Sequence, residues 1–447
     1  MCPMLPITLL AILLFAFIEL TSAASIGTGS LRFEPDMVQV FDGQSTMVVF
    51  RSTEPINENP RDGSKPTVFE CFVKSSSEAT AITDMCEVHY NSSTRHLEGR
   101  LRVKGDLIGH AVADVEIRAD SVEIHRQQLS ITVILYKTVV QHIFLGSVIL
   151  LVSLNYVNMG CAIDMHLIKE TLKKPIGPIV GLVTQFGVMP SIAYVVATNF
   201  LDEAYLKLGL FTFGCSPGGG ASNMWTVLLG GNLDLSVTMT FISTIASLGF
   251  MPLWLFTAGK TFFKEAAPKI PFQNIVSGLV AMVIPLGVGL IMQRYCPKGT
   301  AFCRKILAPF SVMMIIFIVI FGTYANLYMF RLITWEIALA TVLNVWTGFL
   351  IGIILARVIG LPWRDAIAVM VETGIQNTGV AIVLLGVSLP KPDGDMATIV
   401  PVAASTVTPI PLTILWLALR YLRCPSSKDK VRDMSNGEVK FQPIETA

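Results

Sequence analysis

Long apolar runs fill the chain from residue 138 to residue 420, whereas residues 25–137 alternate apolar and polar positions over short stretches. A helix that crosses a bilayer needs about 20 apolar residues, and each long run reaches that length. The nine expected spans are 138–160, 176–199, 205–230, 234–257, 273–292, 306–328, 334–356, 365–388 and 398–420. The pattern therefore predicts an all-α polytopic membrane domain over residues 138–425.

Residues 1–24 combine a short apolar core, Leu5 to Ile18, with the small residues that end at Ala24. This pattern is typical of a secretory signal peptide with a small-residue cleavage site. Because no Lys or Arg precedes the apolar core, a retained signal anchor stays open as the alternative.

The alternating stretches between residues 25 and 137 predict β-strands, and the turn residues between them favour a small all-β domain of sandwich type. The expected strands are 37–41, 47–51, 68–74, 97–103, 112–117 and 129–135. If a signal peptide exports this domain, its two cysteines, Cys71 and Cys86, should form a disulfide. Asn91 begins an N-glycosylation acceptor, which also requires an extracytosolic location. We see no catalytic constellation in this domain and expect its histidines in solvent: His89, His96, His110 and His125.

Composition supports a membrane location. Of 447 residues, 52% are hydrophobic and 15% are charged, with a mean hydropathy of +0.62, whereas soluble domains carry about 25% charged residues. The net charge is +1 and no basic cluster dominates, so no nucleic-acid partner is expected. An odd number of spans after an outside N-terminus places the polar tail, residues 426–447, in the cytosol. Lys and Arg concentrate in the loops and tail expected inside, and we expect a plasma-membrane protein with a disordered tail.

The segment 214–240 interrupts an otherwise apolar run. It contains Pro217 and the glycines Gly218, Gly219 and Gly220, which weaken a helix and free backbone groups. In hydrocarbon such groups need partners inside protein or around a polar cavity. One interpretation is a kink that helps helices pack. The other is a discontinuous helix whose broken centre binds an ion or a substrate.

Glu372 lies within the span 365–388, where an acid costs about 2.5–3.5 kcal/mol to insert. No Lys or Arg inside another span can pair with it, so it is either protonated within the bundle or bound to a cation. Gln376 follows one helical turn later and shares its face if the segment is helical. Ser236 and Thr240 show the same spacing in the span 234–257.

The polar groups inside the spans are hard, mostly neutral oxygen donors. They are the Glu372 carboxylate, the amides of Gln185, Gln376 and Asn223, and the hydroxyls of Ser222, Ser236 and Thr240. Zinc and copper prefer His or Cys, and Ca²⁺ prefers several carboxylates. The set therefore favours sodium, with a proton on Glu372 as the rival coupling ion.

Gly214–Gly218 matches the G-x-S-x-G pattern of a nucleophile elbow. That elbow uses the backbone N–H after the serine as an oxyanion donor, and Pro217 has none. We therefore expect no enzyme activity, no catalytic residue and no organic cofactor.

The GCSPGG…SN stretch, the SxxxT that follows, the QFGVMP segment and the ETGIQN segment resemble the signatures of the sodium/bile acid cotransporter family, solute carrier family 10. They occur in the family's order and spacing, and the resemblance covers about residues 138–420. The long extracytosolic segment makes the chain similar to the long-ectodomain members of that family.

This resemblance implies an inverted repeat in which nine helices remain, with a core and a panel domain and two crossed broken helices. It implies two sodium sites. The first would use Ser222, Asn223, Ser236, Thr240 and Glu372. The second would use Gln185, Glu372 and Gln376, with backbone carbonyls of Thr373 and Ile375.

The resemblance also implies a sodium-coupled symporter of an organic anion that works by alternating access. Bile-acid carriers usually read Asn-Leu where this chain has Gly220-Ala221, so a bile acid, a sulfated steroid and similar amphipathic anions stay open as substrates. A proton-coupled carrier and a non-transporting, receptor-like member are the alternatives. The partner of the extracytosolic domain is unknown.

Overall fold

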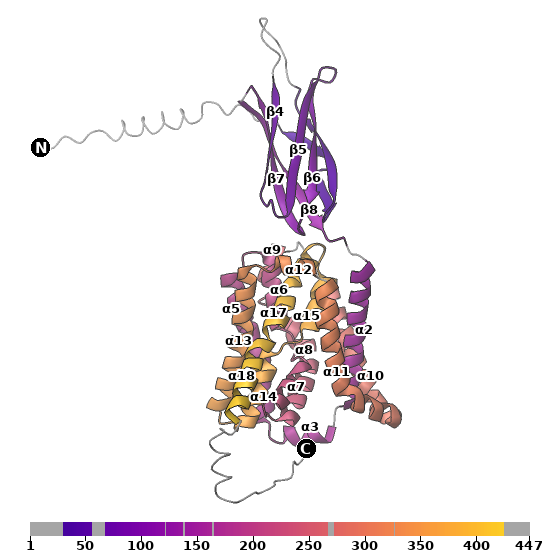
Figure 1. Cartoon of the computed structure of the whole chain (residues 1–447), viewed down its shortest axis with the longest axis vertical. Helices are drawn as coiled ribbons and strands as arrows, with labels where there is room; N and C mark the ends of the chain where they lie inside the picture. The colour runs from indigo at the N-terminus through magenta and orange to yellow at the C-terminus, as the bar shows by residue number, and fades with distance from the viewer. Residues whose placement is uncertain are drawn as a thin grey trace, which may run out of the picture. The chain divides into compact units, whose positions relative to one another are not determined.

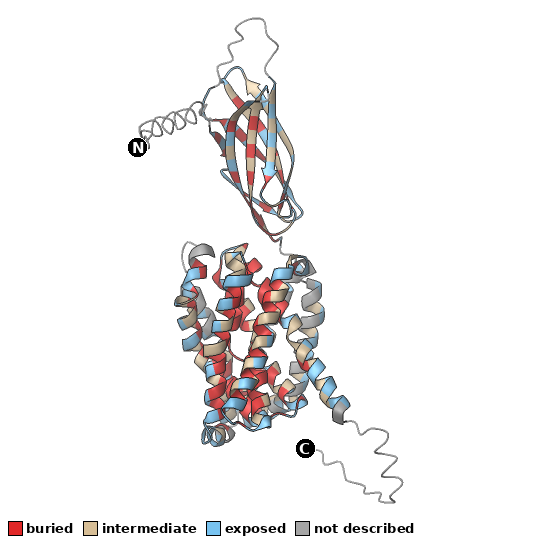
Figure 2. Cartoon of the chain, turned by 90° about the vertical axis from the view of Figure 1, so that its left-hand side faces the viewer, coloured by how far each residue is buried: buried red, intermediate tan, exposed pale blue. Residues whose placement is uncertain are grey.

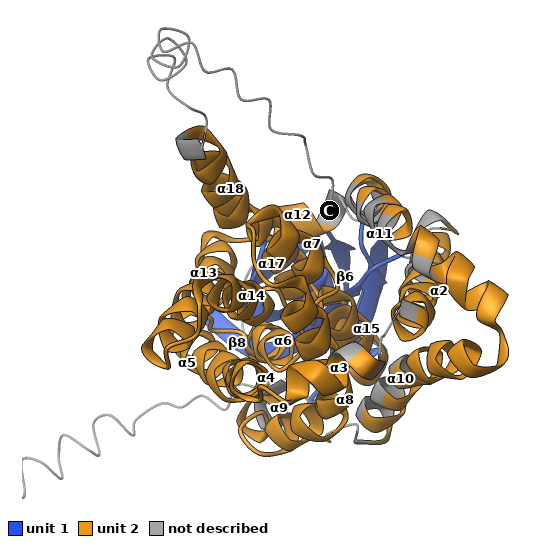
Figure 3. Ribbon diagram, turned by 90° about the horizontal axis from the view of Figure 1, so that it is seen from below, with its two compact units in different colours: residues 1–136 blue, residues 137–447 orange. Residues whose placement is uncertain are grey.

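The computed structural model describes residues 30–55, 68–120, 122–136, 139–162, 165–266, 272–325 and 327–423. The chain divides into two compact units, residues 1–136 and residues 137–447 (Figures 1 and 3). The expected signal peptide, residues 1–24, and the expected tail, residues 426–447, lie outside the described residues.

The described part of the first unit is all β and forms two four-stranded sheets, one in the order β1-β3-β6-β5 and the other in the order β2-β8-β7-β4. Neighbouring strands are antiparallel except β2 and β8, which pair in parallel. The strands are β1 Leu31–Glu34, β2 Met37–Phe41, β3 Ser45–Ser52, β4 Phe69–Ser75, β5 Ala81–Asn91, β6 His96–Gly105, β7 Gly109–Ala119 and β8 Val122–Ile134.

Alternate residues of both sheets meet in one apolar core, which Figure 2 shows as red bands along the strands. Phe50 of β3 and Leu97 and Leu101 of β6 are almost fully buried, as is Ile117 of β7 in the other sheet. Gly99 lies among them because a Cβ at this position would overlap the Phe50 ring. Period-two burial of this kind is what two packed sheets require.

The six strands that we predicted are present, and β1 and β5 were missed. β5 carries Thr83, Asp84 and Glu87, so its alternation is weak, and most of its residues are only half buried or exposed. The expectation of solvated histidines is wrong for His125, which is 5% exposed.

Cys71 and Cys86 form a disulfide. Cys71 lies on β4 and Cys86 on β5, so the bond joins the two sheets. The cross-link closes a loop with a sequence separation of 15 residues. By restricting the unfolded chain, a cross-link that closes a loop of that length stabilises the folded state by about 3 kcal/mol.

We therefore expect the Cys71→Ser/Cys86→Ser variant to lower the stability of the β unit by about 3 kcal/mol. Limited proteolysis of the full chain should show faster cleavage within residues 30–136 and unchanged cleavage elsewhere. Cys296→Ser, which removes an exposed free cysteine, is the matched control. Equal cleavage rates in the double variant and the control would contradict the prediction.

The described part of the second unit is helical. Its helices are α2 Val139–Ala162, α3 Met165–Leu172, α4 Ile176–Val183, the π-helix η1 Thr184–Val188, α5 Met189–Phe200, α6 Ala204–Gly214, α7 Ala221–Leu228, α8 Leu233–Phe256, α9 Lys260–Ala266, α10 Phe272–Tyr295, α11 Pro297–Ala325, α12 Leu327–Leu332, α13 Trp335–Val358, α14 Trp363–Gly374, α15 Thr378–Ser388, α16 Asp393–Ala397, α17 Ile399–Val407 and α18 Pro409–Arg423.

Within the described residues, four helical segments are long and apolar enough to cross a membrane. They are Ile176–Phe200, Leu233–Phe256, Trp335–Val358 and Asp393–Tyr421. Exposed side chains on them are mostly apolar, including Ile179, Val195, Leu350 and Ile354. An apolar exterior is what a helix in contact with lipid tails requires.

α2, α10 and α11 pack against one another, and Figure 3 shows them together at one side of the unit. Gly160 of α2 and Gly289 of α10 meet backbone to backbone, because a Cβ on either would overlap the other helix. Gln293 strengthens this contact by donating to the carbonyls of Gly160 and Cys161, at 2.8 and 3.0 Å. Small residues and interhelical hydrogen bonds are typical of helix packing in membranes.

Candidate functional site

Two of the expected spans are broken near their centres. The first consists of α6 and α7, separated by residues 215–220, and the second of α14 and α15, separated by residues 375–377. Pro217 explains the first break, since it has no N–H to continue a helix. In the second, Ile375 turns to an extended conformation and Asn377 caps α15 by accepting from Val380 N at 3.1 Å.

The two breaks lie against each other and satisfy each other's backbone groups. Gly219 N donates to Ile375 O at 2.8 Å, and Asn377 N donates to Pro217 O at 2.9 Å. Gly218 and Gln376 form an antiparallel bridge between these bonds. Backbone freed by a broken helix must be paired when it is buried away from water, and here each break supplies the partners of the other.

Glycine is required where the breaks meet. A Cβ on Gly218 would overlap Glu372 Oε1, and a Cβ on Gly219 would lie 2.8 Å from Gln376 O. Gly218 N also donates to Ser243 Oγ of α8 at 3.2 Å. The carboxylate of Glu372 therefore lies directly against the backbone of the first break.

Hydroxyl groups surround Glu372, whose side chain is 1% exposed. Thr240 Oγ1 donates to Glu372 Oε2 at 3.0 Å and lies 3.3 Å from Ser222 Oγ. One turn earlier on α8, Ser236 Oγ donates to Asn223 Oδ1 at 3.0 Å. Helices α7, α8 and α14 thus converge on one acid.

Amide groups form a second cluster beside it. Gln185 Nε2 donates to Gln376 Oε1 and to Ser216 O, both at 2.7 Å. Gln376 Nε2 donates to Thr373 O at 2.9 Å, and Thr373 Oγ1 donates to Thr184 Oγ1 at 2.8 Å. This cluster joins η1 to both breaks.

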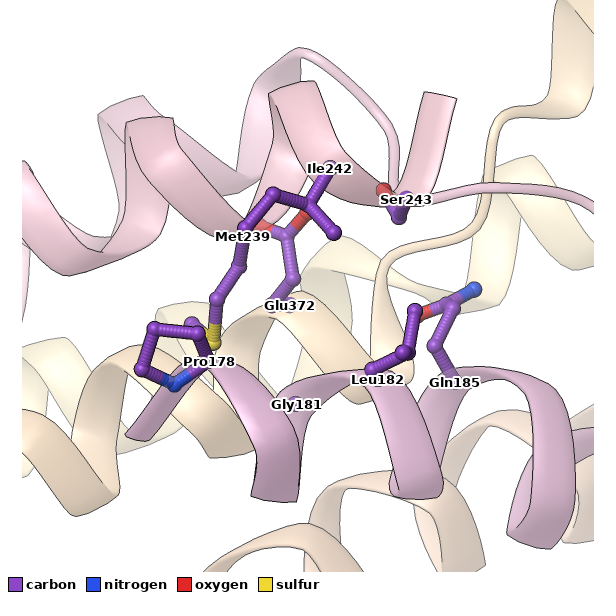
Figure 4. Close-up of a pocket in the computed structure, with 8 residues that line it drawn as sticks. All are labelled: Pro178, Gly181, Leu182, Gln185, Met239, Ile242, Ser243 and Glu372. Atoms are coloured by element: carbon purple, nitrogen blue, oxygen red, sulfur yellow. The ribbon is translucent and has the colours of Figure 1, made fainter. Parts of the chain in front are cut away.

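Among the described residues, Glu372 Oε1 and Gln185 Oε1 are buried and have no hydrogen-bond partner. Both side chains line one narrow cavity, together with Gly181, Met239 and Ser243 (Figure 4). Burying such atoms without a partner is costly, most of all for a carboxylate. A cation between them would satisfy both, and hard oxygen donors suit an alkali cation. The described residues contain no group of three His, Cys, Asp or Glu side chains that could hold a metal ion.

The structure brings the expected side chains together at this crossing: Gln185, Ser222, Asn223, Ser236, Thr240, Glu372 and Gln376. The carbonyls of Thr373 and Ile375 lie there too and accept hydrogen bonds from Gln376 and Gly219. Gly220 is the residue before α7. Asn91 belongs to the first unit, at the end of β5, where its side chain accepts from Ser93 N at 3.1 Å.

Sequence reasoning missed several contributors, among them Ser243, Ser216 and Tyr156. Ser243 lies three residues after Thr240 on the buried polar face of α8, a spacing that the sequence shows. Ser216 contributes its carbonyl, which no sequence pattern indicates. Tyr156 of α2 accepts from Asn377 Nδ2 at 2.8 Å and lies in the polar stretch Asn155–Asn158 of an apolar span, which could have identified it.

Comparison with known proteins identifies a matching family and several relatives of this chain. A family model described as the sodium bile acid symporter family matches residues 148–331. The ileal sodium/bile acid cotransporter of Cricetulus griseus is 32% identical over 246 residues, which are 55% of this chain and 70% of the relative. The hepatic sodium/bile acid cotransporter of Rattus norvegicus is 30% identical over 245 residues, which are 54% of this chain and 67% of the relative. The P3 protein of Homo sapiens is 30% identical over 251 residues, which are 56% of this chain and 53% of the relative.

Proposed function

Because this chain belongs to the sodium bile acid symporter family, we propose that it is a sodium-coupled symporter of an organic anion that works by alternating access. The observation that carries the proposal is the crossing of two broken helices around two buried oxygens, Glu372 Oε1 and Gln185 Oε1, that have no hydrogen-bond partner within the described part of the chain. Discontinuous helices at membrane depth are where secondary transporters bind their coupling ions.

We propose two sodium ions. The hydroxyl cluster around Glu372 would hold the first and the amide cluster around Gln376 the second, with the carboxylate shared between them. The ligands of the first would be Ser222, Asn223, Ser236, Thr240 and Glu372, and those of the second Gln185, Glu372, Gln376 and the carbonyls of Thr373 and Ile375. One carboxylate among many neutral oxygens favours a monovalent ion over Ca²⁺.

Sodium would act through the crossing itself. Its ligands would come from α7, α8, η1, α14 and the second break, residues 375–377, so bound ions would hold both breaks in one arrangement. The N-termini of α7 and α15 begin directly after the breaks, and their partial positive charge would favour the acidic group of a substrate nearby.

Transport would require two groups of helices to move against each other. In our proposal nine spans form an inverted repeat, α2, α10 and α11 belong to the panel, and the broken helices belong to the core. The hydrogen bond from Asn377 to Tyr156 joins α15 to α2, so it would link the two groups. Two sodium ions with a monovalent anion would carry one net positive charge, to which the membrane potential contributes about 2.3 kcal/mol per 100 mV.

The substrate would be a bile acid, a sulfated steroid or a similar amphipathic anion. Two of the relatives are named as sodium/bile acid cotransporters. Gly220 and Ala221 stand beside the crossing, and a Cβ on Gly220 would lie 3.5 Å from Asn155 Nδ2 of α2. The small residues Gly220 and Ala221 therefore leave more room beside the crossing than longer side chains at these positions would. We place the protein in the plasma membrane with its N-terminus outside.

Uptake of radiolabelled organic anions by expressing cells, in sodium and in choline medium, tests the proposal. Sodium-dependent uptake of at least one anion supports it. Uptake driven by a pH gradient in choline would favour the proton-coupled alternative. Binding of a partner by the protein, with no uptake and no effect of altered sodium ligands, would favour a receptor-like role.

Ser236→Ala should raise the sodium concentration for half-maximal uptake by about threefold to tenfold, because one neutral hydrogen-bonding group contributes about 0.5–1.5 kcal/mol. The maximal rate should change little. Ser405→Ala, at an exposed serine of α17, is the matched control and should behave as the wild type. Equal half-saturating concentrations in Ser236→Ala and the control would contradict a role for this hydroxyl.

A further inference from the structure

The π-helix η1 has a local cause. Pro190 has no N–H, so it cannot donate to the carbonyl four residues earlier, that of Phe186. The helical turn contains one extra residue here, so Met189 N donates to Thr184 O, five residues back. Insertions of this kind occur frequently at functional sites. The widened turn contains Gln185, and the Phe186 carbonyl lacks the donor that residue 190 would supply in a regular α-helix.

Trp254 of α8 supplies that donor. Its indole Nε1 donates to Phe186 O at 2.6 Å. Phe186 is 4% exposed and stacks on Phe250, with ring centroids 5.1 Å apart and planes 16° apart. Phe211 packs edge-on against the indole ring at 6.4 Å. The indole is therefore held in place by aromatic packing, and it fixes the carbonyl next to Gln185.

With this bond, both ends of α8 contact the candidate ion site. Near the start of the helix, Ser236 donates to Asn223 and Thr240 donates to Glu372. Trp254, near its end, fixes η1, in which Gln185 donates to Gln376 and Ser216. α8 thus determines the position of the amide cluster as well as that of the hydroxyl cluster.

We infer that Trp254 is a positioning residue for sodium binding, and that its indole N–H holds η1 in the shape that aims Gln185 Oε1 at the ion. This inference rests on the proposed function. Pro190 and Trp254 act together: the proline lacks the backbone N–H that would donate to Phe186 O in a regular helix, and the indole N–H donates in its place. Trp254 need not touch the ion.

The experiment measures how far sodium, compared with choline, raises the melting temperature of the purified full-length protein. A ligand that binds the folded state raises its stability according to its dissociation constant, so no transported anion has to be known. Trp254→Phe keeps an aromatic ring and removes the N–H. We expect it to raise the sodium concentration for half-maximal stabilisation by about threefold to tenfold. Trp346→Phe is the matched control, because its indole donates to Val407 O at an exposed position.

Pro190→Ala restores an N–H that can serve the Phe186 carbonyl within the helix. In a Pro190→Ala background, Trp254→Phe should therefore change sodium affinity by less than twofold. A merely structural loss of packing at Trp254 would give the same shift in both backgrounds, and that result would overturn the inference. So would wild-type sodium affinity in the single Trp254→Phe variant. A wild-type protein that sodium does not stabilise at any concentration would overturn the proposed function, and this inference with it.

Discussion

Replacing Glu372 by glutamine will abolish sodium-dependent uptake while the protein still reaches the cell surface. Glutamine keeps the shape of the side chain and removes its charge. Glu372 Oε1 lies against Gly218 and, among the described residues, has no hydrogen-bond partner, while Oε2 accepts from Thr240. Without the charge a cation at the crossing faces only neutral oxygens in a site shielded from water.

The expected loss is large. Removing one partner of a buried charge pair costs about 3–5 kcal/mol, which corresponds to a loss of at least about 100-fold in sodium affinity. The measurement is sodium-dependent uptake together with surface biotinylation, and Glu372→Ala should give the same result. Glu336→Gln, at an exposed acid in the first turn of α13, is the control and should transport normally. Uptake by Glu372→Gln with wild-type sodium dependence would rule out the proposed role.

The features that sequence alone predicts well are those with a local cause. Pro217 and its glycines break a helix wherever they occur, and the structure has a break there. Glu372 in an apolar run requires a partner whatever the fold. By contrast, β5 was missed because its apolar positions are half buried and its alternation is correspondingly weak.

The features that sequence could not predict depend on contacts between distant segments. Gly219 bonds to Ile375 across 156 positions of the sequence, and no local propensity indicates this pairing. η1 is an intermediate case: Pro190 explains why the helix is disturbed, but only the packing of α8 shows that Trp254 compensates. The position of Tyr156 beside Asn377 likewise follows from tertiary packing.

Gly218→Ala will remove sodium-dependent uptake almost as completely as the loss of Glu372. An alanine Cβ would overlap Glu372 Oε1, so either the backbone or the carboxylate has to move. The backbone is held on two sides, by the bridge to Gln376 and by the bond from Gly218 N to Ser243 Oγ. The carboxylate is the freer group, and its displacement would take the shared ligand away from both proposed sodium sites.

The matched control is Gly386→Ala, in the exposed face of α15, where an added Cβ would meet no described atom within 4 Å other than its own helix backbone and chain neighbours. Alanine favours a helix over glycine by about 1 kcal/mol, so this variant should be slightly more stable and transport normally. Comparing Gly218→Ala with Gly386→Ala separates the effect of replacing a glycine by alanine from the effect of filling the space beside Glu372. If Gly218→Ala bound sodium with wild-type affinity, the carboxylate could not lie against residue 218 in the sodium-bound protein, and the ion would have to be held elsewhere.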